Sequence, residues 1–234
     1  MSEEYEMVLN ESSMGDDRPF DIGIALRQAC LHHQVGRLEC AKAIYHQILA
    51  IEPGNPDALH LLGVISHQNH NYKDGIELIT LAIEIDPNQS SFYNSLANVL
   101  KESGQYQQAL DAYNHAAAIN PKDELVHNNI GVLRHEQGKL DQAIDAYRKA
   151  IAINPNYFEG YSNLGVALRE QGKLDQAVES YQQAIAINPD YSEGYNHLGT
   201  ALKEQGKLNQ AIGAYQKAIK VDPNYIEAYN NLSH

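Results

Sequence analysis

A proline recurs at a fixed interval of 34 residues along nearly the whole chain. The members of this series are Pro53, Pro87, Pro121, Pro155, Pro189 and Pro223. Residues 158–191 are repeated almost unchanged at residues 192–225. A period of this length predicts stacked copies of one supersecondary unit, because a single copy can bury its apolar face only against its neighbours.

The period divides the 234-residue sequence into six repeats and the start of a seventh. The repeats span residues 22–55, 56–89, 90–123, 124–157, 158–191 and 192–225, and residues 226–234 begin a truncated seventh. Residues 1–21 have no period and carry seven acidic residues against one arginine, which predicts a disordered acidic N-terminal tail. The truncated end indicates either a fragment of a longer protein or a surface that docks on a partner or a second copy.

The apolar residues within each repeat follow a helical period. In the fifth repeat, one helix face is formed by Tyr161, Leu164, Gly165 and Leu168. Gly172 is expected to end this first helix. A second helix, beginning near Leu174, is expected to end before Pro189, because the residue before a proline resists helical geometry. Each repeat is therefore predicted to be a helix hairpin.

Small and large residues alternate where the two helices must meet. Counting from the first residue of each repeat, position 8 reads Ala29, Gly63, Ala97, Gly131, Gly165 and Gly199. Position 20 is equally small, and position 24 reads Tyr45, Ile79, Tyr113, Tyr147, Tyr181 and Tyr215. This alternation predicts interdigitated packing of the facing helices at the density of a protein interior.

The pattern resembles the tetratricopeptide repeat. The residues that carry the resemblance in the sixth repeat are Tyr195, Leu198, Gly199, Leu202, Ala211, Tyr215, Ala218 and Pro223. The resemblance implies an all-α, right-handed superhelical solenoid of antiparallel helix hairpins, with the first helix of each hairpin lining a concave groove. The first repeat departs most from the pattern, with Ala25, Gln28 and His32 in place of large core residues.

Composition restricts the classes of partner. The net charge of −13 provides no basic stripe for nucleic acid and disfavours an anionic membrane surface. Two cysteines and the absence of an apolar leader favour a cytoplasmic protein. We expect no metal, no cofactor and no catalytic site, because the eleven histidines lack metal-binding spacing and no catalytic motif occurs. The chain is therefore predicted not to be an enzyme.

Positions 2, 5, 6, 9, 12 and 13 of the first helix share the face opposite the core. At positions 5 and 6 this face carries Asn94, Asn128, Asn129, Asn163, Asn196, His197, Asn230 and Asn231, and Asn98 lies at position 9. Asparagine is a poor helix former, so its recurrence needs a reason. It indicates either a ladder that binds the main chain of an extended peptide or hydrogen bonds between repeats.

Charged residues form two further columns on this face. Position 12 is basic or histidine and includes Lys101, Arg169 and Lys203, while position 2 ends acidic at Glu159, Glu193 and Glu227. The columns fit either groove chemistry or the helix dipole, which favours acids at a helix start and cations at its end. The basic column is counted with the asparagines as a candidate peptide-binding site.

The asparagine pattern also resembles the repeat region of protein O-linked N-acetylglucosamine transferases and related bacterial proteins. That resemblance implies that Asn129, Asn163 and Asn231 contact the backbone of a bound protein. The predicted function is a non-catalytic scaffold that binds an extended peptide or partner helix in its concave groove. The alternative is the substrate-recruiting arm of a longer glycosyltransferase, and self-association through the C-terminal end is a third hypothesis.

Overall fold

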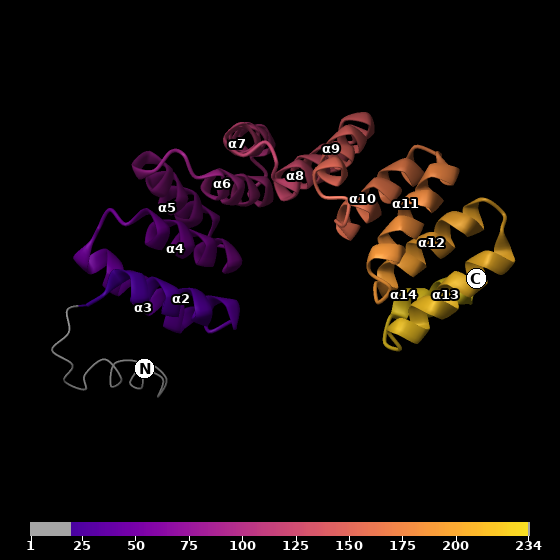
Figure 1. Ribbon diagram of the computed structural model, residues 1–234, viewed down its shortest axis with the longest axis horizontal. Helices are drawn as coiled ribbons and strands as arrows, with labels where there is room; N and C mark the ends of the chain where they lie inside the picture. Colours follow the sequence, from indigo (N-terminus) through magenta and orange to yellow (C-terminus); the bar gives the residue numbers. More distant parts are fainter. Residues whose placement is uncertain (1–19, 234) are drawn as a thin grey trace. The chain divides into compact units, whose positions relative to one another are not determined.

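The computed structural model describes residues 20–233, and every regular element in this range is an α-helix (Figure 1). The predicted all-α solenoid of helix hairpins is confirmed. The expected tail of residues 1–21 lies outside the described residues except for Phe20 and Asp21.

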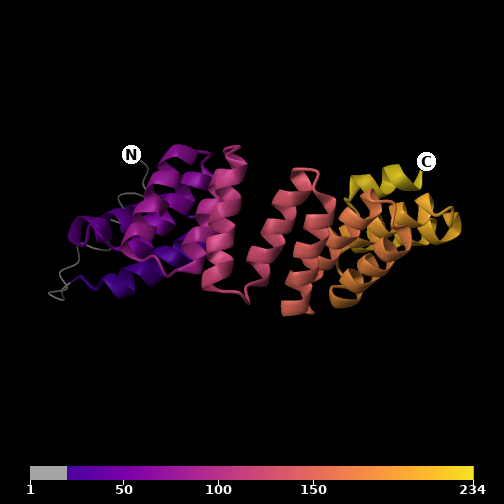
Figure 2. The same ribbon diagram turned by 90° about the horizontal axis from the view of Figure 1, so that it is seen from above.

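The structure divides into two compact units, whose described parts are residues 20–119 and 120–233. The first contains α2 (Ile22–Gln34), α3 (Leu38–Ile51), α4 (Pro56–Gln68), α5 (Tyr72–Ile85), α6 (Ser90–Glu102) and α7 (Tyr106–Ile119). The second contains α8 (Glu124–Glu136), α9 (Leu140–Ile153), α10 (Phe158–Glu170), α11 (Leu174–Ile187), α12 (Ser192–Glu204), α13 (Leu208–Val221) and α14 (Ile226–Leu232). In each unit, consecutive helices pack as hairpins that stack on one another (Figure 2).

The hairpin ends follow the sequence signals. Helix α10 ends at Glu170, and Gly172 adopts a φ of 76°, a left-handed conformation that costs glycine little. Helix α11 ends at Ile187, and Asn188 before Pro189 has extended backbone angles (φ −124°, ψ 91°). The first described helix is capped by the side chain of Asp21, whose Oδ1 accepts a 3.0 Å hydrogen bond from the backbone N–H of Ile24.

The core lies between the paired helices. Tyr45, Tyr113 and Tyr181 at position 24 are fully buried, as is Ala177 at position 20. The close helix approach is visible at Gly165, where a Cβ would lie only 2.6 Å from Cε1 of Tyr181. The predicted alternation of small and large residues therefore describes the packing of the hairpins.

The first helices of successive repeats also touch one another. Contacts join α4 to α6 in the first unit, and α8 to α10, α10 to α12 and α12 to α14 in the second. Within each unit, the first helices therefore lie side by side and share a continuous surface. The right-handed superhelix remains a prediction.

Candidate functional site

The surface shared by the first helices carries the predicted site residues. We call positions 2, 5, 6, 9, 12 and 13 of α8, α10 and α12, together with positions 2, 5 and 6 of the shorter α14, the inner surface of the second unit. Its polar side chains come from four successive repeats at equivalent positions. Each of these side chains can either bond to a neighbouring repeat or remain available to a ligand.

The asparagines at positions 5 and 6 pair between neighbouring repeats. Nδ2 of Asn163 donates a 2.9 Å hydrogen bond to Oδ1 of Asn128, and Nδ2 of Asn231 donates one of the same length to Oδ1 of Asn196. Asn128 and Asn196 are 7% and 6% exposed, whereas Asn163 and Asn231 are half-buried. The position 5 members therefore link the repeats, and the position 6 members retain accessible surface.

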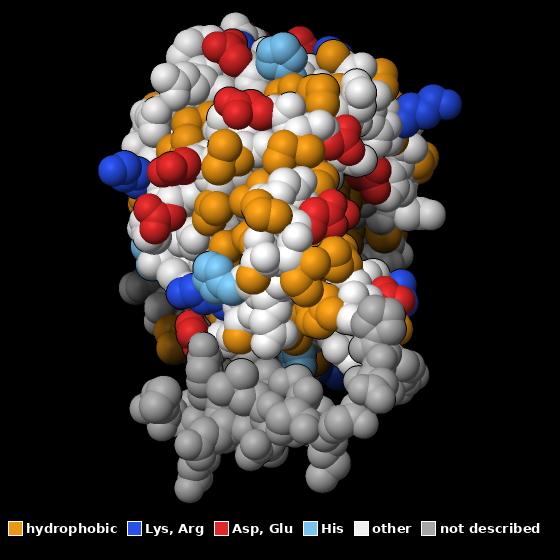
Figure 3. Space-filling view, turned by 90° about the vertical axis from the view of Figure 1, so that its left-hand side faces the viewer, with side chains coloured by type: hydrophobic (Ala, Val, Ile, Leu, Met, Phe, Trp, Pro, Cys, Tyr) orange, Lys and Arg blue, Asp and Glu red, His pale blue; other side chains and the backbone are white. Residues whose placement is uncertain are grey.

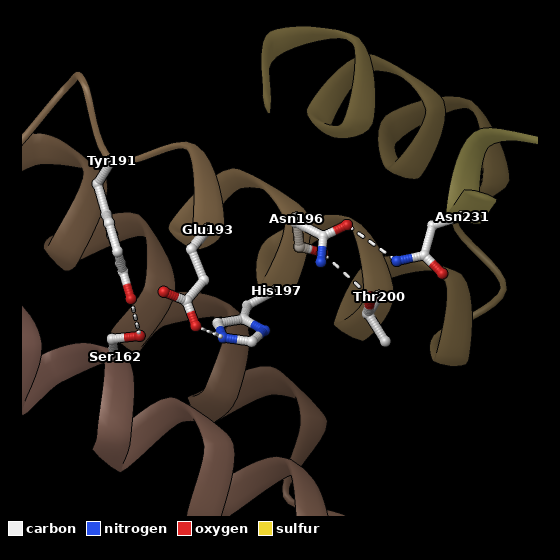
Figure 4. A network of polar contacts seen from close by, with 7 residues as sticks. All are labelled: Ser162, Tyr191, Glu193, Asn196, His197, Thr200 and Asn231. Carbon is white, nitrogen blue, oxygen red and sulfur yellow. Dashed lines mark hydrogen bonds and ion pairs between the residues drawn. The ribbon is translucent and has the colours of Figure 1, made fainter. Parts of the chain in front are cut away.

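Figure 4 shows the second of these pairs in its surroundings, with the side chains of Asn196 and Asn231 turned toward each other. The hydroxyl of Thr200 donates a 3.1 Å hydrogen bond to the backbone carbonyl of Asn196. The bond between Asn231 and Asn196 orients both carboxamides, whereas the Thr200 hydroxyl contacts only the backbone. The pair of asparagines supports the prediction of hydrogen bonds between repeats, which is compatible with ligand binding by the remaining amide atoms.

Three of the other predicted asparagines occupy different environments. Oδ1 of Asn98 accepts a hydrogen bond from the hydroxyl of Tyr113 and therefore belongs to the packing of its own hairpin. Asn94 lies half-buried on α6 of the first unit, and Asn129 lies half-buried on α8 of the second. The predicted asparagines and His197 are consequently divided between the two units rather than gathered in one of them.

The basic column at position 12 pairs with position 13 of the following repeat. Nη1 of Arg169 lies 2.8 Å from Oε1 of Glu204, and Nε2 of His135 lies 2.8 Å from Oε2 of Glu170. The first unit repeats the arrangement, with Nε2 of His67 at 2.9 Å from Oε2 of Glu102. Each pair joins neighbouring repeats through residues that are 35 positions apart in the sequence. The paired acids reduce the positive charge that the column offers to a ligand.

The acids at position 13 were missed by the sequence reasoning, which related position 12 only to the helix dipole or to a ligand. A search for opposite charges 35 residues apart would have found them. Of the remaining cations in the column, Lys101 is half-buried and Lys203 is exposed on α12. Lys203 is therefore the more accessible of the two predicted lysines.

His197 is held between a carboxylate and an aromatic ring. Its Nε2 lies 3.3 Å from Oε1 of Glu193, and its ring stacks on that of Tyr181 with a centroid distance of 5.4 Å. Burial lowers the pKa of His197 below its usual value, Glu193 opposes the change and the positive charge of Arg169 adds to it. His197 is therefore a packed side chain on the inner surface.

The hydroxyl of Tyr181 differs in its surroundings from the equivalent tyrosine hydroxyls of other repeats. In the third and sixth repeats, the tyrosine at position 24 donates to a polar residue at position 9, as Tyr215 does to Oγ1 of Thr200 at 3.3 Å. In the fifth repeat position 9 is Val166, and the Tyr181 hydroxyl has no hydrogen-bond partner among the described residues. Burial is the main cause that raises the pKa of Tyr181.

A row of tyrosines and glutamates borders the start of the first helices. The hydroxyls of Tyr191 and Ser162 are 2.9 Å apart (Figure 4). Burial raises the pKa of Tyr191 to about 12, a change that the Ser162 hydrogen bond opposes and the charge of Glu193 increases. Burial, with the charges of Glu159 and Glu124, likewise raises the pKa of Tyr157 to about 12. This border of the inner surface is therefore acidic.

Across residues 20–233, no group of three or more histidine, cysteine, aspartate or glutamate side chains is arranged to hold a metal ion. Within the same range, none of the helices has the length and apolar character needed to cross a membrane.

Family models match most of the chain. A model described as TPR repeat matches residues 97–138, 133–168, 166–206 and 200–233, and models described as tetratricopeptide repeat match residues 56–89 and 78–111. The chain belongs to the tetratricopeptide-repeat family. No curated protein matches it.

Solved structures share its fold at low sequence identity. Pseudomonas aeruginosa PilF is 18% identical with a TM-score of 0.78, covering 91% of this chain and 96% of PilF. MamA is 22% identical with a TM-score of 0.64, covering 71% of this chain and 97% of MamA. YrrB, described as a tetratricopeptide-repeat protein with an unusual peptide-binding site, is 16% identical with a TM-score of 0.63, covering 81% of this chain and 98% of YrrB.

Proposed function

We propose that this tetratricopeptide-repeat protein is a non-catalytic interaction scaffold and that the inner surface of its second unit binds an extended peptide. The observation that carries the proposal is the orientation of Asn163 and Asn231 by hydrogen bonds to the preceding repeat. Each uses one amide hydrogen in that bond and keeps a second hydrogen and its own Oδ1. These are the donor and acceptor that a peptide main chain requires.

Orientation before binding reduces the cost of binding. A free asparagine side chain loses rotamer freedom when it meets a ligand, whereas Asn163 and Asn231 are already held at 2.9 Å by their partners. Each hydrogen bond to a peptide contributes only about 0.5–1.5 kcal/mol net. A surface built from a few such contacts supports adaptable binding, with dissociation constants on the order of micromolar.

The charge of the inner surface favours a neutral or basic peptide. Glu159, Glu193 and Glu227 are exposed at equivalent positions of α10, α12 and α14, while Arg169 is paired with Glu204. The acidic row would repel a free carboxylate and attract lysine or arginine side chains. The family membership and the peptide-binding site described for YrrB are consistent with this proposal at the level of the fold.

The test is a peptide array probed with the whole protein and with two inner-surface variants. Peptides that contain lysine or arginine are expected to bind, and Asn163→Ala together with Asn231→Ala should weaken all of them. Changing Glu159, Glu193 and Glu227 to glutamine should weaken the basic peptides and reduce their salt dependence.

The controls are Asn209→Ala and Glu179→Gln, exposed residues of the second helices α13 and α11. Neither change should alter binding. Peptide binding that survives both inner-surface variants, each shown by circular dichroism to be folded, would contradict the proposed site.

Self-association is a second candidate, favoured by exposed apolar side chains on α13 and α14. Leu208 is 58% exposed, Ile212 43%, Ile226 70% and Tyr229 47%. Apolar surface of this kind is typical of contact regions. Light scattering across a dilution series is expected to show concentration-dependent assembly that Ile226→Asp abolishes, and a monomer at every concentration would exclude it.

The recruiting arm of a longer glycosyltransferase remains the alternative prediction. The asparagine pattern is compatible with it, because main-chain binding would serve a scaffold and a recruiting arm equally. The complete reading frame distinguishes the two, since a catalytic domain after His234 would establish the enzyme.

A further inference from the structure

Position 2 of the inner surface changes character along the second unit. In α10, α12 and α14 this position carries the exposed acids Glu159, Glu193 and Glu227. In α8 the same position is Leu125, which is 52% exposed. The row formed by the position 2 residues is therefore apolar at its α8 end and acidic along the rest of its length.

Position 9 changes in the same direction. It is Val132 in α8 and Val166 in α10, which are both half-buried and pack against the core cluster that includes Tyr181, and it is Thr200 in α12. Leu125 and Val132 are seven residues apart and share one face of α8. The apolar part of the inner surface therefore lies over α8 and α10.

The position 2 residues of the first unit show no such separation. Within residues 20–119 they are Gly23, Asp57 and Ser91. Across the face of the first unit that Figure 3 shows, hydrophobic side chains are mixed with acidic ones. The ordered change from an apolar to an acidic position is a property of the second unit.

We infer that the inner surface of the second unit selects peptides in which an apolar residue stands at one end of a series of lysine or arginine residues. The inference rests on the proposed function and names the class of peptide. Leu125 packs against the apolar side chain, and the acids of the row pair with the basic ones. An apolar residue inside the series would instead cover one of the acids and remove it from water, which costs free energy.

The side-chain contacts are compatible with the main-chain contacts to asparagine. Position 6, which holds Asn163 in α10 and Asn231 in α14, lies four residues after position 2 on the same helix face. One helical turn rises about 5.4 Å, so a peptide whose main chain is held by Asn163 can reach Glu159 with a lysine or arginine side chain. The same relation holds between Asn231 and Glu227.

The acid in α12 is less available than the other two. Position 6 of this helix is His197, whose Nε2 lies 3.3 Å from Oε1 of Glu193. His197 therefore competes with a ligand for this carboxylate. Glu159 and Glu227, which are each followed at position 6 by an asparagine, should provide most of the preference for basic residues.

The distance between the first helices determines the spacing within the peptide. Helices α8, α10, α12 and α14 contact one another in succession, and packed helices lie about 8–10 Å apart. A peptide in the polyproline II conformation rises about 9 Å in three residues and places every third side chain on one face. The selected peptide therefore carries its apolar residue and its basic residues at intervals of three.

The test uses isothermal titration calorimetry of the whole protein with acetylated and amidated peptides. Three of them share one composition and differ only in the place of the leucine: LPARPARPAR, RPARPARPAL and RPALPARPAR. The fourth, RPARPARPAR, has no leucine. One of the two peptides with a terminal leucine should bind about fivefold more tightly than the peptide with an internal leucine, because only the terminal leucine meets Leu125 without covering an acid.

Leu125→Glu gives all four first helices an acid at position 2. It should abolish the preference for a terminal leucine and tighten binding of the all-arginine peptide by up to about fivefold at low salt. Leu208→Glu is the matched control, because it adds the same charge at a leucine of α13 that is 58% exposed and lies outside the inner surface. It should change neither property, and circular dichroism shows that both variants are folded.

Two results would overturn the inference while peptide binding remains. One is equal affinity for the peptides with terminal and internal leucine, and the other is the same change of affinity in Leu125→Glu and in Leu208→Glu. If Asn163→Ala with Asn231→Ala still weakens these peptides, the proposed function stands and only the inferred selectivity fails. If none of the four peptides binds the unmodified protein, the proposed function and the inference fail together.

Discussion

The close approach of α10 and α11 gives the sharpest test of the packing. In Gly165→Ala, the added Cβ would lie 2.6 Å from Cε1 and 2.8 Å from Cδ1 of Tyr181. Real side chains do not approach so closely, so either the ring or one of the helices must move. The ring is fully buried and stacked against that of His197, which limits its freedom. The substitution should therefore force the hairpin apart.

The magnitude follows from two opposing effects. Overpacking a core with one extra carbon costs about 1–3 kcal/mol. Replacing a helical glycine by alanine returns up to about 1 kcal/mol of helix propensity. Ala29 and Ala97 face Tyr45 and Tyr113 in other repeats, so a spacing that accepts a Cβ is attainable within this fold. We expect Gly165→Ala to lower the free energy of unfolding by about 1–2 kcal/mol.

Gly213→Ala in α13 is the matched control. No heavy atom lies within 4 Å of the Cβ that this change would add, so only the propensity gain of about 0.5–1 kcal/mol should remain. Urea denaturation followed by circular dichroism measures both variants against the unmodified protein. The reasoning fails if Gly165→Ala is as stable as the unmodified protein, or if the two substitutions shift the midpoint in the same direction.

Three further predictions concern polar contacts. Asn128→Ala and Asn163→Ala should each lower the free energy of unfolding by about 0.5–1.5 kcal/mol. Because the two side chains share one hydrogen bond, their effects should not add in a double-mutant cycle, and full additivity would exclude the bond between repeats. Glu204→Gln removes the exposed ion pair with Arg169. It should lower the free energy of unfolding by less than about 1 kcal/mol and have no effect in high salt. A larger loss of stability in urea denaturation would refute this. Burial and, to a smaller extent, the charge of another histidine lower the pKa of His60 from 6.5 to about 4. As the pH falls, the imidazole of His60 is protonated first in the unfolded chain. The free energy of unfolding should therefore decrease by up to about 3 kcal/mol between pH 6.5 and 4. The same pH dependence in His60→Gln would contradict this.

The hairpins were predictable because their determinants are local and repeated. Gly172 and Pro189 mark the ends of α10 and α11, and the fully buried Tyr181 and Ala177 occupy the expected core positions. Each of these residues acts within its own repeat or on its immediate neighbour. Their spacing in the sequence is therefore sufficient to predict the elements and the packed faces.

The candidate site was only partly predictable. The sequence left two interpretations of the asparagines, and the structure shows bonds between repeats for Asn128 with Asn163 and for Asn196 with Asn231. The sequence does place opposite charges at Arg169 and Glu204, 35 residues apart, but only the structure shows the 2.8 Å hydrogen bond between them, because that distance depends on how two repeats are offset along their axes. A hydrogen bond is decided by tenths of an ångström, which a sequence pattern does not specify.

Two isoleucines at position 21 show what the tertiary structure alone decided. Ile144 in α9 is 3% exposed and belongs to a core cluster, whereas Ile212 in α13 is 43% exposed. The residue type and its position in the repeat are identical, so the sequence by itself determined a helix with an apolar side chain on the stacking face. Whether that side chain is buried depends on the neighbour stacked against it, because burial is a property of the assembled repeats and not of the repeat itself.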